Sequence, residues 1–256
     1  MAKDDGSVRL DFTERVAWVT VERPPLNRLD AAALAALDRA LDEAGQNADA
    51  AVLVMSGAGT EAFCGGLELS GRTPDEVAEL TRAFHRAVKK LVRLPQAIVA
   101  AVDGVASGAG LELALVADVV VASDRSRLGL GHVRQAALGC VAAVTLPTIC
   151  GRPPASDLVL SGGMIDPARA QNIGLVSRVF PAEEFDESLR ALVARLADAS
   201  ASVLRLTAQT MRSRWLSGFD VALDAVERTY LAELTRDPDM AEGLKALAEA
   251  RKPVWR

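Results

Sequence analysis

The feature that most constrains the fold of this chain is a set of three short apolar runs: AVLVMS at 51–56, AIVAAV at 97–102 and VVVAS at 119–123. Their short length and their valine and isoleucine content are typical of buried strands. Helical patterns separate them, and strands joined by helices form a parallel sheet with right-handed crossovers. Continuous apolar runs also indicate a sheet covered on both faces. The sequence therefore predicts an α/β core.

Other elements flank this core. Two strands are expected at 8–12 and 16–21, and a helix is expected from an N-cap at Asp30 to a stop at Gly45. A long helix should begin at Thr73 and end near Val92. From about 153 onward the pattern is mainly helical, apart from a short strand in LVSRVF at 175–180, and it continues to Ala250.

Composition narrows the class of protein. The 256 residues are 50% hydrophobic and 25% charged, which is typical of a soluble globular protein, and no run reaches the ~18 apolar residues of a membrane span. The N-terminus, MAKDDGSVRL, lacks the apolar stretch of a signal peptide, so we expect a cytoplasmic protein. Three cysteines without metal-ligand spacing and two histidines make a zinc site improbable, and no metal is expected.

Charge argues against general nucleic-acid binding, because the formal net charge is −5. One exception is a basic stripe on the predicted long helix, formed by Arg82, Arg86, Lys89, Lys90 and Arg93. The stripe is either a solvated helix face or a phosphate-contacting surface, and the first interpretation is the default for charged helix faces. His85, on the same helix, is expected to be partly exposed.

Two glycine-rich loops are the strongest chemical signal. A nucleotide-phosphate loop at GVASGAG is excluded, since Leu113 occupies the place of the third glycine of a dinucleotide fingerprint and no GK[ST] element is present. AFCGGLEL at 62–69 and SGAGLELAL at 107–115 each follow an apolar strand, so both loops should lie where α/β folds bind ligands. Small residues there let backbone N–H groups approach a substrate oxygen.

Several ordered segments carry a family resemblance. ERPPLNRLD resembles an RP-x-x-N-A-L segment, AFCGGLEL resembles AFCAGADL, and AAVDGVASGAGLELALVADVVVAS resembles AAVNGxALGGGxELALACDIxIAS. LSGGMIDPARAQNIGLVSRVF is similar to LTGxxIxAxEAxxxGLVxxVVP. Along nearly its whole length the chain resembles the crotonase, or enoyl-CoA hydratase/isomerase, superfamily. PPLNRLDAAALAAL and the C-terminal region look closest to the branch that acts on cyclohexadiene-carbonyl-CoA.

The resemblance implies a crotonase fold of repeated ββα units, with a core domain at 1–195 and a helical trimerisation region at 196–256. It implies homotrimers or dimers of trimers, an acyl-CoA substrate, and no cofactor beyond the coenzyme A that the substrate carries. The predicted CoA contacts are Asn27, Arg28, Leu29, Ala62 and Phe63.

The same resemblance implies an oxyanion hole, made by the backbone N–H groups of Leu67 and Ala109, that binds the thioester oxygen as an enolate forms. Ala109 replaces a family glycine and adds a methyl group. Glu112 matches the first of the two hydratase glutamates, and the leucines around it suggest an apolar setting that would favour its protonated form.

The second acid departs from the pattern. Where a hydratase has its second glutamate, this chain has His132, which can also transfer protons near neutral pH. Some CoA-thioester decarboxylases of the family likewise keep only the first acid, so the alternative to hydration is decarboxylation or another lyase or isomerase reaction of the family. A further alternative is a non-catalytic member that binds acyl-CoA or RNA.

Two other residues near the loops are expected to be structural. Glu68 should be a structural carboxylate rather than a third acid, and Cys64 should be a packed thiol.

The sequence thus predicts an enoyl-CoA hydratase-like lyase that adds water to an unsaturated acyl-CoA, with cyclic dienoyl groups included. Glu112 and His132 are its predicted catalytic residues.

Overall fold

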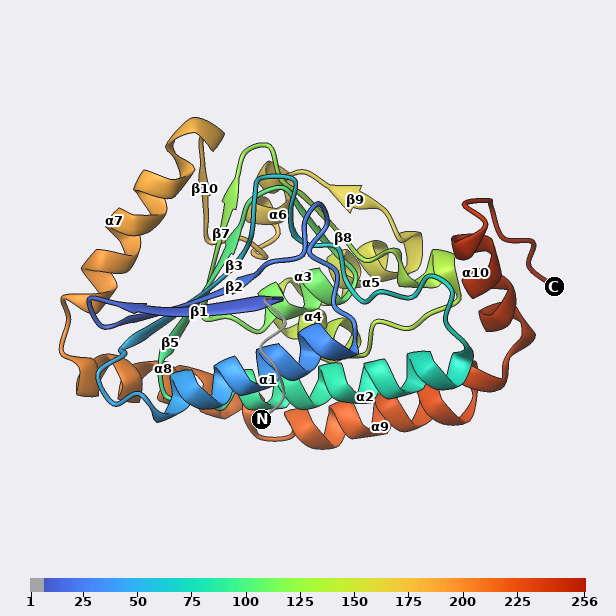
Figure 1. Cartoon of the computed structure of the whole chain (residues 1–256), viewed down its shortest axis with the longest axis horizontal. Helices are drawn as coiled ribbons and strands as arrows, with labels where there is room; N and C mark the ends of the chain where they lie inside the picture. Colours follow the sequence, from blue (N-terminus) through green and yellow to red (C-terminus); the bar gives the residue numbers. More distant parts are fainter. Residues whose placement is uncertain (1–6) are drawn as a thin grey trace.

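The chain folds around two β-sheets, seen in a computed structural model that describes residues 7–256 (Figure 1). Residues 1–6 of the polar N-terminus lie outside the described residues. The main sheet has the strand order β1-β2-β3-β5-β7-β10. Its strands are β1 Val8–Thr13, β2 Val16–Val21, β3 Val52–Gly57, β5 Ala97–Val102, β7 Val119–Ser123 and β10 Arg178–Phe180. Only β1 runs antiparallel to its neighbour, so the predicted parallel core is confirmed.

A smaller sheet carries the glycine-rich loops. Its order is β4-β6-β8-β9, formed by β4 Ala62–Cys64, β6 Val105–Ser107, β8 Arg127–Gly129 and β9 Met164–Ile165. β4, β6 and β8 are parallel, and β9 is antiparallel to β8. The two predicted loops leave β4 and β6, which are neighbours, and they therefore emerge side by side at one edge.

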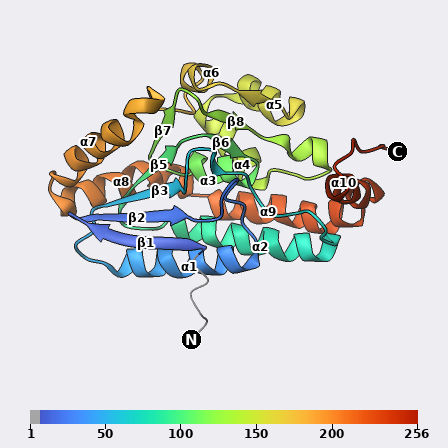
Figure 2. The same cartoon turned by 45° about the horizontal axis from the view of Figure 1, so that its top comes forward.

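Helices cover both faces of the main sheet. They are α1 Ala31–Gln46, α2 Pro74–Leu91, α3 Ala109–Leu115, α4 Cys140–Ile149, α5 Arg152–Ser161, α6 Pro167–Asn172, α7 Phe185–Ala197, α8 Ala201–Leu216, α9 Phe219–Ala232 and α10 Pro238–Ala248, with short 3-10 helices η1 Gly131–Gln135, η2 Ala182–Glu184 and η3 Leu234–Arg236. Figure 2 shows α1, α2 and α9 along one side of the sheet and α7 on the other.

Successive side chains along each strand point to opposite faces of the main sheet, and this explains why helices pack on both faces. Leu53 and Met55 of β3 join the larger core with α1 and α2, whereas Val52 and Val54 pack against α7. Because every residue of β5 is buried, its run reads as continuously apolar instead of alternating.

Element boundaries follow the predicted caps with small differences. Asp30 caps α1 through a hydrogen bond to the Ala33 N–H, and Thr73 with Glu76 forms a capping box on α2. α1 runs one residue past Gly45. The strand expected at 175–180 is limited to β10, because residues 175–177 form an irregular connection between the turn after α6 and the sheet.

The long helix α2 differs from expectation on one face, because α9 packs against it (Figure 1). His85, expected to be partly exposed, is only 3% exposed and contacts Glu227 of α9. Two residues of the basic stripe also pair with α9: Lys89 with Asp224 and Arg93 with Asp220.

The other basic residues with recorded partners also meet carboxylates. Lys90 pairs with Asp38 and Asp42 of α1, and Arg82 pairs with Glu79. Most of the stripe thus joins helices or pairs within α2 and is not an open phosphate surface. In the part of the chain that the structure describes, no helix combines the length and apolar character needed to cross a membrane.

Candidate active site

The two glycine-rich loops touch at their tips, and glycines make this contact possible. A Cβ added to Gly110 would lie 2.0 Å from the Cys64 carbonyl oxygen, so the start of α3 rests directly on the backbone of β4. A Cβ on Gly66, whose φ is +94°, would lie 2.9 Å from the Ser107 oxygen and 3.4 Å from the Ala109 nitrogen. Larger residues would force the loops apart.

The backbone of the first loop leaves the Leu67 N–H unused. An isolated parallel bridge joins Leu29 to Leu67, in which the Leu29 N–H donates to the Gly66 oxygen (2.8 Å) and the Glu68 N–H donates to the Leu29 oxygen (2.9 Å). Such a bridge uses the residues on either side of Leu67. Among residues 7–256, no hydrogen bond from the Leu67 N–H is recorded.

The second loop supplies a matching donor. Ala109 is the first residue of α3, and the first N–H groups of a helix have no partner within it. Gly108 precedes it with φ +55° and serves as the N-cap without a side chain that could occupy those donors. Both Leu67 and Ala109 line the same cavity, so the two predicted oxyanion-hole residues are brought together there.

Glu112 lies one turn further along α3, with 2% of its surface exposed. Its Oε1 accepts a hydrogen bond from the Ala142 N–H at 2.8 Å, and its position in the first turn of α3 favours a negative charge. The predicted apolar setting is confirmed, because its helix neighbours Leu111 and Leu113 are buried. One carboxylate oxygen is therefore held by the backbone, and the other is left for the cavity.

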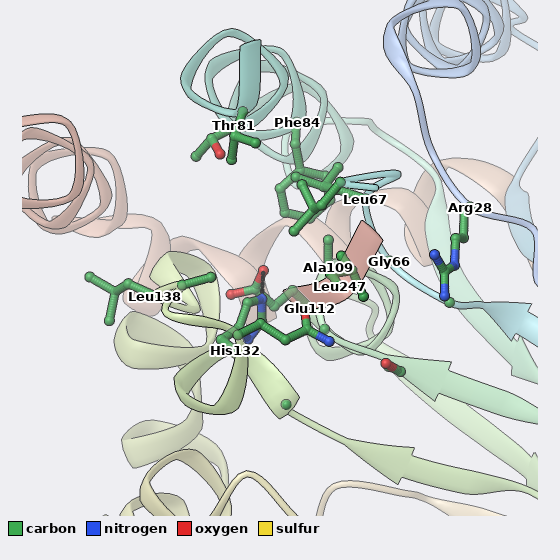
Figure 3. Close-up of a pocket in the computed structure, with 18 of the residues that line it drawn as sticks. Arg28, Gly66, Leu67, Thr81, Phe84, Ala109, Glu112, His132, Leu138 and Leu247 are labelled. Carbon is green, nitrogen blue, oxygen red and sulfur yellow. Dashed lines mark ion pairs between the residues drawn. The ribbon is translucent and has the colours of Figure 1, made fainter. Parts of the chain in front are cut away.

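His132 reaches that second oxygen. It lies on η1, and its Nε2 is 3.8 Å from Glu112 Oε2. The His132 side chain is 17% exposed, against 3% for the Glu112 side chain. Figure 3 shows the pair at the base of the cavity, with Leu67 and Ala109 nearby and Arg28 at one side. The histidine predicted to stand in for a second acid is thus next to the first acid in space.

Comparison with known proteins decides the family. Residues 11–256 match the family model described as enoyl-CoA hydratase/isomerase. The chain belongs to this family. The crotonase fold and the expectation of an enzyme of the hydratase type are confirmed with it.

Individual relatives are similar over almost their whole length. A cyclohexa-1,5-dienecarbonyl-CoA hydratase from Thauera aromatica is 33% identical, over 91% of this chain and 90% of that protein. A 2,3-dehydroadipyl-CoA hydratase from Escherichia coli K12 is 32% identical, over 95% and 96%. The crystal structure of an enoyl-CoA hydratase from Mycobacterium avium subsp. paratuberculosis K-10 superposes with a TM-score of 0.88 at 28% identity, covering 98% of each chain.

The structure describes all five predicted CoA contacts, and it places them differently. Arg28 lines the cavity, and the other four do not. Leu29, Ala62 and Phe63 are packed in the interior. Asn27 has a structural arrangement, since its amide donates to the carbonyls of Ala58 (2.9 Å) and Ala62 (2.6 Å). Their contact with CoA stays a prediction.

Glu68 and Cys64 occupy structural settings, as expected. Glu68 lies 3.4 Å from Arg28 in an ion pair and accepts the Ser70 N–H. Burial raises the pKa of the Cys64 thiol to about 12, so the thiol stays protonated and is a poor nucleophile.

The sequence analysis missed one wall of the cavity. Thr81 and His85 of α2 and Tyr230 of α9 also line it. The helical spacing of Thr81 and His85 could have placed them on one face of α2. No sequence signal indicated that α9 would cover this face. Within residues 7–256, no group of three or more His, Cys, Asp or Glu side chains is arranged to hold a metal ion.

Proposed function

We propose that this protein is a hydro-lyase that adds water to the conjugated double bond of an unsaturated acyl-CoA, with cyclic dienoyl groups among its substrates. The observation that carries the proposal is the convergence on one cavity of two free backbone N–H groups, from Leu67 and Ala109, and the Glu112–His132 pair. The similarity to hydratases of unsaturated CoA thioesters supports it.

Each part has a role in the proposed reaction. The two N–H groups bind the thioester oxygen and stabilise the negative charge that develops there when hydroxide adds to the β-carbon. Glu112 accepts the proton of the attacking water, and the Glu112–His132 pair returns a proton to the α-carbon. At 3.8 Å, Oε2 and Nε2 are close enough to contact one water molecule together. Addition of water requires no redox cofactor, because no electrons leave the substrate.

Arg28 is proposed to hold the CoA end of the substrate. Its guanidinium lies at the side of the cavity in Figure 3 and is about one-third exposed. A planar guanidinium is suited to a phosphate oxygen, and Glu68 orients it.

The oxyanion hole can be tested with a matched pair of glycine variants. Gly66→Ala places a methyl group 3.4 Å from the Ala109 nitrogen, whereas Gly71→Ala has a similar positive φ (+72°) and no neighbour within 4 Å. Both variants carry the backbone strain of a left-handed alanine. Hydration of crotonyl-CoA and cyclohexadiene-carbonyl-CoA should fall about 100-fold in Gly66→Ala and by less than threefold in Gly71→Ala.

Equal rates in the two variants would remove the oxyanion hole from the proposal. Release of carbon dioxide from methylmalonyl-CoA without hydration of either unsaturated thioester would replace hydration by decarboxylation. A wild-type protein that turns over none of these thioesters would contradict catalysis of this kind altogether.

We also propose that the chain assembles as a homotrimer or a dimer of trimers through residues 196–256. Three large apolar side chains of α8 are exposed on the single chain: Val203, Leu206 and Met211. An apolar face of this kind is typical of a subunit contact. Light scattering on the purified protein should give a mass three or six times that of one chain, and a monomer would contradict the proposal.

A further inference from the structure

The α2 wall of the cavity is polar in a way that the proposed hydration does not use. Thr81 and His85 from α2 and Tyr230 from α9 form what we call the polar wall. In Figure 3, Thr81 lies across the cavity from Glu112 and His132. With the thioester at Leu67 and Ala109 and the reacting carbons near Glu112, the remaining part of the acyl group meets this wall.

His85 has one nitrogen engaged and one available. Its Nδ1 lies 2.5 Å from Glu227 Oε2, and an ionised carboxylate makes Nδ1 the donor of that bond. No partner of Nε2 is recorded among the described residues, and the ring lines the cavity. Because only 3% of His85 is exposed, an apolar acyl group would leave Nε2 unpaired away from water.

The position of Glu227 is set by the packing of α9 on α2. His85 and Lys89 of α2 and Arg93, two residues past its end, follow one another at four-residue intervals. They meet Glu227, Asp224 and Asp220 of α9 in reverse order. This antiparallel ladder of three pairs aligns the two helices. Only the member that lines the cavity is a histidine, so the ladder ends there in a group that can accept a hydrogen bond.

Tyr230 complements His85 on the same wall. Burial raises the pKa of Tyr230 to about 12, and the phenol therefore remains a hydrogen-bond donor throughout the neutral range. The Thr81 hydroxyl hydrogen-bonds Tyr230 and by itself lowers the phenol pKa, as a donor to the phenol oxygen does, so the phenol proton is left to donate elsewhere. The polar wall thus contributes both an acceptor and a donor to the lining of one cavity.

From this arrangement we infer that His85 is a specificity-determining residue that selects acyl groups bearing a hydroxyl beyond the β-carbon, with Glu227 as its positioning residue. The inference rests on the proposed binding of acyl-CoA in this cavity. A hydroxyl donates to His85 Nε2 and accepts from Tyr230, so it satisfies both groups at once. A carboxylate at the same place is disfavoured, because Glu227 and Glu112 already contribute negative charge around the cavity.

Binding of saturated thioesters tests the inference without any turnover. Isothermal titration would compare cyclohexanecarbonyl-CoA with its 4-hydroxy, 2-hydroxy and 4-carboxy derivatives. The Glu112→Gln background prevents dehydration of the 2-hydroxy compound. The 4-hydroxy group should tighten binding about tenfold over the unsubstituted ring, and the 2-hydroxy and 4-carboxy groups should not.

Substitutions then assign the preference to His85. In His85→Phe the 4-hydroxy preference should fall below twofold, while the unsubstituted ring still binds. Glu227→Gln should reduce the preference to about threefold, because the amide leaves the imidazole less firmly oriented. Lys89→Gln removes the next pair of the ladder, outside the cavity, and should retain the full tenfold preference.

Several outcomes would overturn the inference. A 4-hydroxy preference unchanged in His85→Phe, or no such preference in the Glu112→Gln protein, would do so while leaving the hydratase proposal intact. Failure of every thioester to bind would contradict both proposals. If His85→Phe does not fold, as judged by circular dichroism, His85→Leu replaces it, because leucine also lacks a hydrogen-bonding group, and the same loss of preference is expected.

Discussion

Two carboxylate–histidine pairs place a side chain in the cavity lining, and they are built in opposite ways. In the Glu112–His132 pair the carboxylate is buried, at 3% exposure, and the histidine is the more accessible member. In the His85–Glu227 pair the histidine is buried, at 3%, and the carboxylate is 21% exposed. The atoms of the first pair are 3.8 Å apart, and those of the second are 2.5 Å apart.

This difference fits two purposes. We call Glu112–His132 the reacting pair and His85–Glu227 the recognising pair. The open spacing of Glu112 and His132 leaves room for both to contact a third group, which proton transfer to a substrate requires. The close spacing of His85 and Glu227 commits one nitrogen to the carboxylate and orients the ring. The same two residue types thus serve different purposes according to which member is buried and how close the partners lie.

The largest effect is expected from the buried carboxylate of the reacting pair. Glu112→Gln keeps the acceptor for the Ala142 N–H but removes the base, so crotonyl-CoA hydration should fall about 1000-fold. Steady-state kinetics would measure this loss. Glu79→Gln removes the same negative charge at an exposed position and serves as the control. A loss smaller than tenfold would show that Glu112 does not transfer the proton.

A smaller loss of activity is expected from substitution of His132, the other member of the reacting pair. His132→Gln should lower kcat by about 30–100-fold, because Glu112 remains to activate water while its proton-sharing partner is gone. Val133→Ala, at the neighbouring exposed position of η1, is the control. Equal losses in His132→Gln and Val133→Ala would assign His132 a structural role in η1.

Spacing within the reacting pair can be changed without touching either residue. A Cβ on Gly139 would lie 2.8 Å from His132 Nδ1 and 3.2 Å from Glu112 Oε1, whereas a Cβ on Gly131 meets nothing within 4 Å. We expect Gly139→Ala to reduce kcat about tenfold and Gly131→Ala to leave it within twofold. If both variants retain wild-type kcat, the separation of Glu112 and His132 is unimportant.

The smallest expected effect is on the stability of the fold, from substitution of Glu227 in the recognising pair. Glu227→Gln should lower the free energy of unfolding by about 1 kcal/mol, since a partly exposed carboxylate is replaced while Lys89–Asp224 and Arg93–Asp220 still join the helices. Urea denaturation followed by circular dichroism would measure the change. A destabilisation above about 3 kcal/mol would indicate that this pair, and not the rest of the ladder, holds α9 on α2.

Much of the framework could be predicted from local sequence. The strands 51–56, 97–102 and 119–123 and the caps at Asp30 and Thr73 are local signals, and the structure differs from them by at most a residue or two. The sequence alone did not decide whether His132 would lie beside Glu112. The two meet because α3 and η1 follow the neighbouring strands β6 and β8.

The recognising pair could not be predicted in the same way. His85 and Glu227 are 142 positions apart, and their contact depends on how α9 folds back over α2. The sequence of α2 alone suggests an exposed basic face, because the acidic partners of Lys89 and Lys90 lie on other helices. Asn27 illustrates a similar limit: its side chain braces the carbonyls of Ala58 and Ala62, which local sequence does not indicate.

The contribution of α9 and α10 to the cavity has a consequence for how the protein is made. Tyr230 and Leu247 line a pocket whose oxyanion loops were synthesised more than a hundred residues earlier. A nascent chain that has emerged only through α7 possesses Glu112 and both loops, but the core still lacks Phe219, Leu223 and Tyr230 of α9. During that interval the growing chain exposes surface that attracts other unfolded chains. Translation speed over the codons for α8 to α10 therefore bears on the yield of folded protein.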